Sequence, residues 1–151
     1  MAMSNLAVKG DIKRQPGRDA AFFNRLGREH LPEYLGVQIT EVQDGVLRAS
    51  LVLKQALFAP NGFLHAGTVV SLADTATGYA CVAHLPEGAR SFTTLELKAN
   101  FLGTAKAGSI HCEARAVHLG RTTQVWDAVV TDDDERPIAM FRCTQMILYP
   151  R

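Results

Sequence analysis

The segment Leu64-His65-Ala66-Gly67-Thr68-Val69-Val70-Ser71-Leu72-Ala73-Asp74-Thr75-Ala76-Thr77-Gly78-Tyr79-Ala80 decides the fold. Across residues 68–83 the small and apolar side chains are spaced for a helix that is apolar on nearly every side, and such a helix is buried. Between Lys54 and Glu87, Asp74 is the one residue certain to carry charge in water. A carboxylate in a buried helix is costly unless it is paired, hydrogen-bonded or used, so Asp74 is the first candidate functional residue.

The composition predicts one globular domain. The chain has 151 residues, of which 47% are apolar, and this is enough for a substantial core. The net charge of +1 and the scattered basic residues argue against a nucleic-acid surface or a basic membrane anchor. His65, Gly67 and Gly78 interrupt the apolar segment around Asp74, so we expect a core helix and not a membrane span.

The cysteines and the N-terminal residues favour a cytoplasmic protein. Cys81, Cys112 and Cys143 are far apart and lie in apolar runs, which predicts reduced core thiols and no metal site. Residues 1–15 lack the apolar block of a signal peptide. We expect residues 1–17 to form a flexible arm and residues 18–151 to form the domain.

Strands are predicted on both sides of the central helix. The domain begins with a short amphipathic helix at residues 19–29, which Pro32 and Gly36 are expected to close. Two strands, at residues 37–42 and 46–53, flank the hairpin signal Asp44-Gly45. Four more follow at residues 91–101, 109–119, 122–131 and 137–149. In the first of these, strict alternation places Phe92, Thr94, Glu96 and Lys98 on one face.

This order of elements, with connections short enough for antiparallel hairpins, predicts an α+β structure. A helix that is apolar all round must be covered on more than one side. The simplest solution is a curved antiparallel sheet wrapped around it, which is the hotdog fold.

Several motifs, in the right order, resemble one family. Leu64-His65-Ala66-Gly67 followed by Ser71-Leu72-Ala73-Asp74-Thr75-Ala76 resembles the His-Gly-Gly…Leu-Ala-Asp-x-Ala signature of the PaaI-like (phenylacetate-pathway) hotdog acyl-CoA thioesterases, including the nine-residue separation of His and Asp. Residues 92–102 resemble the next strand of the family, and His118-Leu119-Gly120-Arg121-Thr122-Thr123 resembles its turn with Gly-Arg or Gly-Lys. The chain departs from the pattern at Ala66, where the family usually has Gly, and at Ala59, where it often has Asn.

The resemblance implies roles for residues of the central segment. Asp74 would act as the nucleophile or as the general base for water, and the Ala66 N–H would polarise the thioester carbonyl at the helix N-terminus. Gly67 would permit close approach, and His65 would hydrogen-bond the carbonyl or order the loop. Asn61, two residues after Ala59, would donate its amide to the carbonyl or serve as a turn residue.

The resemblance also implies roles outside that segment. Thr94 aligns with a Ser or Thr that helps to place the water, although a strand Thr is also explained by its β propensity. Arg121, at the turn with Gly120, would bind phosphates of CoA or remain a solvated charge. Lys98 and Asn100 are weaker candidates for the same role.

The sequence thus predicts an acyl-CoA thioesterase that releases free acid and CoA from an aryl or medium-chain thioester, without a metal or redox cofactor. Ala66 and Asp74 lie about 12 Å apart along one helix at 1.5 Å per residue. One chain is therefore not expected to bring both to one thioester, which predicts a site-forming homodimer. The family resemblance implies a homotetramer of two such dimers. A hotdog hydratase or dehydratase and a non-catalytic acyl-CoA-binding protein are the alternatives.

Overall fold

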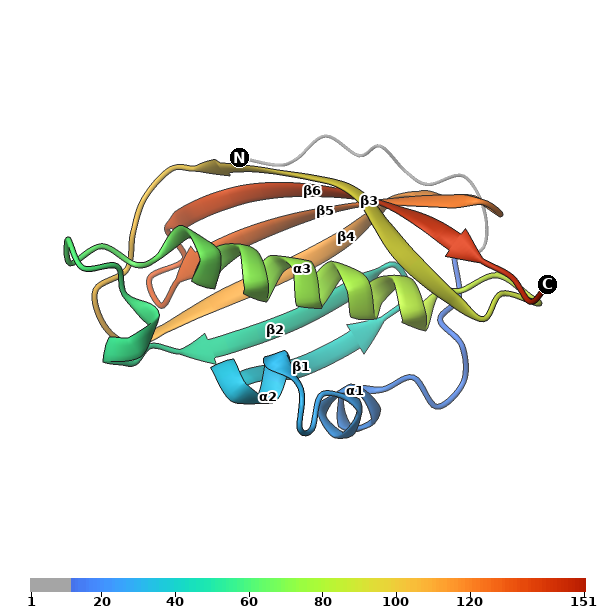
Figure 1. The fold of residues 1–151 in the computed structure, drawn as a ribbon, viewed down its shortest axis with the longest axis horizontal. Helices are drawn as coiled ribbons and strands as arrows, with labels where there is room; N and C mark the ends of the chain where they lie inside the picture. The colour runs from blue at the N-terminus through green and yellow to red at the C-terminus, as the bar shows by residue number, and fades with distance from the viewer. Residues whose placement is uncertain (1–11) are drawn as a thin grey trace.

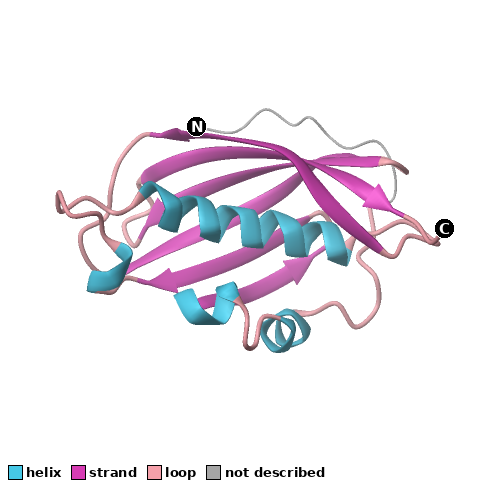
Figure 2. Cartoon of the chain, viewed as in Figure 1, coloured by secondary structure: helices cyan, strands magenta, loops and turns pink. Residues whose placement is uncertain are grey.

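A computed structural model describes residues 12–151. Six antiparallel strands form one curved sheet in the order β1-β2-β4-β5-β6-β3, and the long helix α3 lies against its concave face (Figure 1). The strands are β1 (Val37–Gln43), β2 (Val46–Val52), β3 (Ser91–Phe101), β4 (Ser109–Leu119), β5 (Thr123–Asp132) and β6 (Pro137–Leu148). The helices are α1 (Ala20–Leu26), α2 (Leu31–Leu35), the 3-10 turn η1 (Gln55–Leu57) and α3 (Ala66–Ala83). The predicted curved sheet around a long central helix is confirmed (Figure 2).

Helix α3 is held by small residues that let the sheet approach it closely. It contacts all six strands, and Leu72, Ala76 and Ala80 are completely buried against them. The outward stripe with Ser71, Asp74 and Thr75 is half-buried, so the helix is less fully covered than its composition predicts. Within residues 12–151, no helix is both long and apolar enough to cross a membrane.

The two edges of the sheet differ. On α1, the side-chain amide of Asn24 donates to the Ile39 carbonyl (2.9 Å) and accepts from the Ile39 N–H (2.8 Å), so it occupies part of the β1 edge. The other edge, β3, exposes Leu95, Leu97 and Phe101 by 41–56%. A long edge strand with exposed apolar side chains is a pairing surface, so β3 is left open to a partner.

The alternation predicted for β3 is wrong beyond Thr94. A bulge between Thr94 and Glu96 inserts one extra residue and reverses the faces of the strand. Thr94 is opposite the buried Gln145, on the side of α3, whereas Lys98 is opposite the exposed Arg142 on the convex face.

The N-terminal helix is shorter than predicted, and a second helix follows it. The Asp19 carboxylate caps α1 by accepting from the Phe22 N–H at 2.8 Å. Pro32, predicted to close the first helix, lies in the first turn of α2, where its missing N–H costs no helical hydrogen bond. Gly36, with φ 90°, ends α2 in the left-handed conformation that glycine adopts readily.

The predicted arm lies partly outside the described residues, which begin at residue 12. In its described part, the Arg14 N–H donates to Asp44 Oδ1 (2.9 Å) and the Gln15 N–H donates to the Ala83 carbonyl (2.8 Å). The Gln15 side chain also donates to the Leu85 carbonyl at 2.8 Å. These bonds hold Arg14 against the β1–β2 turn and Gln15 against the C-terminal end of α3.

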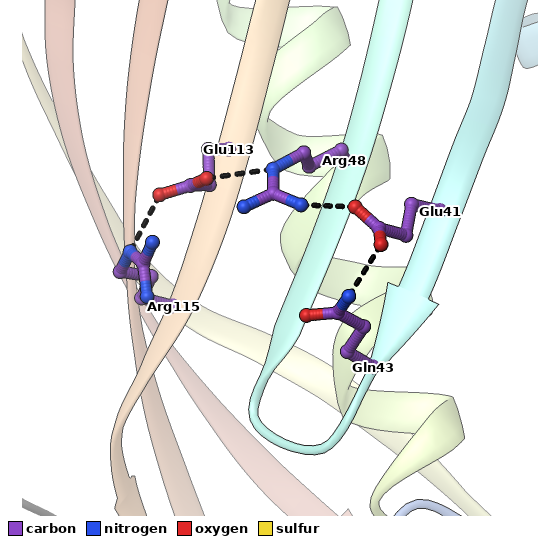
Figure 3. A network of polar contacts seen from close by, with 5 residues as sticks. All are labelled: Glu41, Gln43, Arg48, Glu113 and Arg115. Atoms are coloured by element: carbon purple, nitrogen blue, oxygen red, sulfur yellow. Dashed lines mark hydrogen bonds and ion pairs between the residues drawn. The ribbon is translucent and has the colours of Figure 1, made fainter.

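The convex face of β1, β2 and β4 carries a network of paired charges (Figure 3). The sheet register places Arg48 opposite both Glu41 and Glu113, and its guanidinium contacts both carboxylates. Arg115 contacts the other oxygen of Glu113, and Gln43 donates to Glu41. The groups are part-exposed, so the network neutralises this face without adding much stability.

His84 joins the end of α3 to the β1–β2 turn. It is 6% exposed, its Nε2 accepts from the Gly45 N–H (2.9 Å), and its Nδ1 is 2.8 Å from the Ala80 carbonyl. Because Nε2 is the acceptor, the ring is neutral with its proton on Nδ1. The pKa of His84 is lowered, mainly by burial and also by the charge of Arg14. The hydrogen bond to Ala80 and the charge of Asp44 act in the opposite direction.

We therefore expect the free energy of unfolding to fall as the pH drops below the ordinary histidine value of 6.5. The unfolded chain takes up the proton first, so the stability due to neutral His84 is complete above that pH and is lost below it, by at most about 1.4 kcal/mol per pH unit. Urea unfolding at several pH values measures the slope. His84→Gln, which keeps a donor and an acceptor, should have a shallower slope, and an equal slope in both proteins would contradict the assignment to His84.

Candidate active site

The loop before α3 holds His65 in a defined orientation. The His65 N–H donates to the Leu57 carbonyl (3.2 Å), and the neighbouring Leu64 N–H donates to Thr104 Oγ1 (3.1 Å). The His65 side chain caps the helix, because its Nδ1 accepts from the Gly67 N–H at 2.8 Å. With Nδ1 as acceptor, the neutral ring carries its proton on Nε2, which leaves that N–H as a donor for a ligand.

The Ala66 N–H is the free donor of the first turn. The Gly67 N–H bonds to the His65 ring, and the Thr68 and Val69 N–H groups both donate to the His65 carbonyl (2.9 and 3.4 Å). Among residues 12–151 the Ala66 N–H has no hydrogen-bond partner, and it lies at the positive end of the helix. A carbonyl oxygen or an oxyanion is the group that such a donor binds.

Gly67 is required by the His65 ring. A Cβ on Gly67 would lie 2.9 Å from His65 Nδ1, closer than real contacts allow, and 3.1 Å from Cε1, so the ring would have to shift. Glycine thus leaves room for the His65 ring, and the close approach of a substrate carbonyl stays a prediction.

Asp74 lies two turns further along α3 and carries an unpartnered carboxylate. The side chain is half-buried and has neither a hydrogen bond nor an ion pair within the described part of the chain. Within the described residues, the Asp74 carboxylate therefore does not cap a neighbouring backbone group. Burial raises the pKa of the Asp74 carboxyl above its ordinary value, which makes it a stronger base than a solvated carboxylate.

Thr94 and Asp74 approach the same buried thiol. The pKa of Cys143 is raised to about 11 by burial and by the charge of Asp74, and polar groups of Thr77, Thr94 and Gln145 oppose that rise. These side chains come from α3, β3 and β6, and they gather on the concave side of the sheet. The fold therefore brings Thr94 to the same cluster as Asp74 within one chain.

The cysteines have no nucleophile-like environment. All three are buried and reduced, and burial raises the pKa of both Cys81 and Cys112 to about 12. At neutral pH such thiols are protonated and unreactive. In the part of the chain that the structure covers, no three His, Cys, Asp or Glu side chains are grouped to hold a metal ion.

Asn61 lies in the exposed turn before His65. Its Oδ1 accepts from the Phe63 N–H at 3.2 Å, as expected of a turn residue. The turn uses the side-chain oxygen, so the amide NH₂ is the part of Asn61 that a ligand could reach.

The four predicted CoA-binding residues fall into two separate places. Gly120 and Arg121 border an open cleft of about 440 Å³ beyond the C-terminal end of α3. The Arg121 guanidinium lies 5.8 Å from the centre of the Tyr149 ring and has no carboxylate partner among residues 12–151. A Cβ on Gly120 would lie 2.9 Å from the Thr123 backbone carbonyl oxygen as well as 2.5 Å from His118 Nε2, so this turn favours glycine.

Lys98 and Asn100 lie elsewhere, in a shallow cleft of about 230 Å³ on the convex face. Arg142 and Asp127 form a two-contact ion pair in the same cleft. The β3 bulge turns Lys98 away from α3, so one chain does not bring Lys98 and Asn100 to Arg121 or to Asp74.

Gln145 belongs with Asp74, Thr94 and Cys143 on the concave side of the sheet, and the sequence did not predict it. Its inward position on β6, alternating with Cys143 and Ile147, was the available signal.

A free N–H at a helix N-terminus and an unpartnered, half-buried carboxylate on the same helix suit the chemistry of a carbonyl-activating hydrolase. The family model described as the Thioesterase superfamily matches residues 61–139. The chain belongs to this superfamily, and it is a thioester hydrolase, as predicted.

Known proteins agree with this assignment. The chain is 33% identical to the 1,4-dihydroxy-2-naphthoyl-CoA hydrolase of Listeria monocytogenes, over 76% of this chain and 92% of that protein. The structure of a mutant thioesterase from Pseudomonas aeruginosa superposes with a TM-score of 0.85 at 31% identity and covers 91% of this chain and 99% of that one. Escherichia coli PaaI shares the fold, with a TM-score of 0.76 at 22% identity over 85% of this chain and 91% of that one. The predicted PaaI-like hotdog family is confirmed.

We expect Gly67→Ala to displace the His65 ring and remove the helix cap. Loss of an N-cap costs about 0.5–2 kcal/mol of stability, and a displaced donor should lower kcat for an acyl-CoA by about tenfold or more. Steady-state kinetics and thermal unfolding measure the two effects.

The matched control is the double variant with His65→Ala. If the added methyl acts through the ring, Gly67→Ala should lower kcat much less when His65 is already alanine. Equal losses in both backgrounds would show that the methyl acts on something else.

Proposed function

We propose that the protein hydrolyses acyl-CoA thioesters to the free acid and CoA, at sites formed between two copies of the chain. The observation that carries this proposal is the unpartnered carboxylate of Asp74 on the same helix as the free N–H of Ala66. Neither group has a structural task within the described residues, and together they match the two needs of thioester hydrolysis.

The N-terminus of α3 would activate the carbonyl. Its oxygen accepts from the Ala66 N–H, and the Nε2–H of His65 is placed as a second donor by the Gly67 cap. Both donors are fixed before the substrate arrives, so they stabilise the developing oxyanion without reorganisation. Asp74 then attacks the carbonyl carbon or takes a proton from the attacking water, with Thr94 helping to place that water. If Asp74 attacks, the C–S bond breaks to release the CoA thiolate, water hydrolyses the acyl-Asp74 anhydride to the free acid, and the proton released protonates the thiolate. If Asp74 acts as the base, the proton that it holds passes to the sulfur as the C–S bond breaks, and CoA leaves as the thiol.

Two chains would supply one site. Ala66 and Asp74 are about 12 Å apart along α3, too far to act on one carbonyl carbon. The open β3 edge, with Leu95, Leu97 and Phe101 exposed, would pair with the β3 strand of a second copy. We assign His65, Ala66 and Gly67 to one chain and Asp74 and Thr94 to the other. A homotetramer of two such dimers is the larger assembly that the family resemblance implies.

The substrate would be an aryl or medium-chain acyl-CoA. The naphthoyl-CoA specificity named for the Listeria relative supports an aryl group. For the CoA phosphates, Arg121 is the better candidate, because its guanidinium has no carboxylate partner whereas Arg48 and Arg115 are held by glutamates. Hydrolysis is favoured over a hydratase reaction and over binding alone by the thioesterase membership.

If Asp74 is the base or the nucleophile, kcat/KM should rise with pH through the pKa of its carboxyl. The active form is the carboxylate, and burial raises this pKa, so the loss of activity on acidification should begin above the range of a solvated Asp. Release of CoA from a panel of aryl and medium-chain acyl-CoAs, followed with a thiol reagent, gives the profile.

Asp74→Asn is the control, because it keeps the size of the side chain and removes the charge. We expect kcat to fall by about a hundredfold or more and the acidic limb to disappear. Turnover that is unchanged in this variant, or a wild-type protein that releases CoA from none of the thioesters, would overturn the proposed function.

Mixing two inactive variants tests the shared site. After unfolding and refolding together, His65→Ala and Asp74→Asn chains should form half of all dimers as heterodimers, each with one intact site. About a quarter of the wild-type activity should return, as random pairing requires. Sedimentation of the wild type separates the dimer from the tetramer. No recovery of activity in verified heterodimers would show that each site belongs to one chain.

A further inference from the structure

Gln145 on β6 carries a buried amide that no protein group satisfies. Its side chain is completely buried, and neither Oε1 nor Nε2 has a hydrogen-bond partner among residues 12–151. The Gln145 side chain lowers the pKa of the Cys143 thiol, but a thiol sulfur is a weak acceptor and a weak donor and does not satisfy an amide. Buried amides are nearly always bonded, so such a side chain calls for a ligand or a water.

Gln124 is a natural comparison, because it lies directly opposite Gln145 in the sheet. It is also buried, but its amide is fully used: Nε2 donates to the His84 carbonyl (2.8 Å), and Oε1 accepts from the Trp126 indole N–H (2.9 Å). The fold therefore provides partners for the amide on β5 and none for the amide on β6.

The unsatisfied amide lies on the catalytic side of the sheet. Gln145 is opposite Thr94 on β3, and both side chains act on the thiol of Cys143, which also feels the charge of Asp74. Thr77, whose hydroxyl donates to the Ala73 carbonyl at 3.0 Å, already has a partner in α3. The amide of Gln145 and the carboxylate of Asp74 are thus two unpartnered polar groups on the concave side of the sheet, on β6 and on the α3 helix that packs against it.

We propose that Gln145 positions the hydrolytic water for Asp74; this rests on the proposed thioesterase function and assigns Asp74 as the general base. The water donates one hydrogen bond to Gln145 Oε1 and the other to Asp74. This orientation points a lone pair of the water oxygen at the thioester carbonyl carbon. Asp74 takes the second proton as the water oxygen bonds to the carbonyl carbon. When the C–S bond breaks, that proton passes to the CoA sulfur. Gln145 exchanges no proton, so it is a positioning residue.

The test is Gln145→Met, which keeps an unbranched side chain of similar size and removes both polar atoms. We expect kcat to fall by about tenfold or more with KM within about twofold, because substrate binding does not use the amide. The midpoint of thermal unfolding should stay equal or rise, because the variant removes an unsatisfied polar group. Thr94→Val should lower kcat less in this variant than in the wild type, since both side chains place the same water.

Gln124→Met is the matched control at the opposite position. It leaves the His84 carbonyl and the Trp126 N–H without their hydrogen-bond partner, so the midpoint of thermal unfolding should fall. The kcat of the folded protein should stay within about threefold of the wild-type value. The role of Gln145 in placing the water is overturned if Gln145→Met keeps the wild-type kcat, or if it lowers the midpoint of thermal unfolding as Gln124→Met does. In either case an active wild-type enzyme leaves the proposed function standing. A wild-type protein without thioesterase activity overturns both.

Discussion

The burial of α3 is the constraint on which the rest of the structure depends. Leu72, Ala76 and Ala80 must be covered, and a sheet reaches them all only by curving along the whole helix. To complete that cover, the strand after α3 crosses to the far side of β6, which makes β3 an edge. Asp74 lies on the half-buried stripe of α3, at the border of the core. Burial at this position raises the pKa of its carboxyl.

Several charges on the convex face and in the β5–β6 turn are paired. Arg48 and Arg115 share Glu113, Arg142 holds Asp127 through both oxygens, and Arg136 closes the β5–β6 turn on Asp132. These pairs follow from strand register and turn geometry and leave the convex face nearly neutral. Asp74 and Arg121 are among the charged groups that have no such partner in the described residues. Their positions distinguish them, because Asp74 is half-buried on α3 and Arg121 borders the cleft beyond the end of that helix. These positions suit a substrate with a reactive thioester at one end and phosphates at the other.

The sequence predicted the features that periodicity and motif spacing record. The small apolar residues specified α3, and the spacing of His65 and Asp74 indicated two functions within it. It failed where a single residue changes the outcome without altering the composition. Pro32 begins a helix and does not end one, because the first turn needs no N–H from it. The β3 bulge leaves no mark in the sequence, yet it separates Lys98 from Thr94. Gln145 was missed because its inward position on β6 indicates burial but not function, and its lack of a partner depends on which side chains surround it in space.

The unsatisfied groups are not scattered over the molecule. At the β1 edge Asn24 bonds to the exposed backbone, and at the end of α3 every polar atom of Gln124 and His84 has a partner. On the other side, the Gln145 amide, the Asp74 carboxylate and the β3 edge all lack one within the described chain. Each buried unsatisfied polar group costs about 1–3 kcal/mol, a large fraction of the roughly 5–15 kcal/mol that holds a domain together. In the proposed function, a second β3 strand would complete the open edge, and a substrate and its water would complete the site beside Asp74.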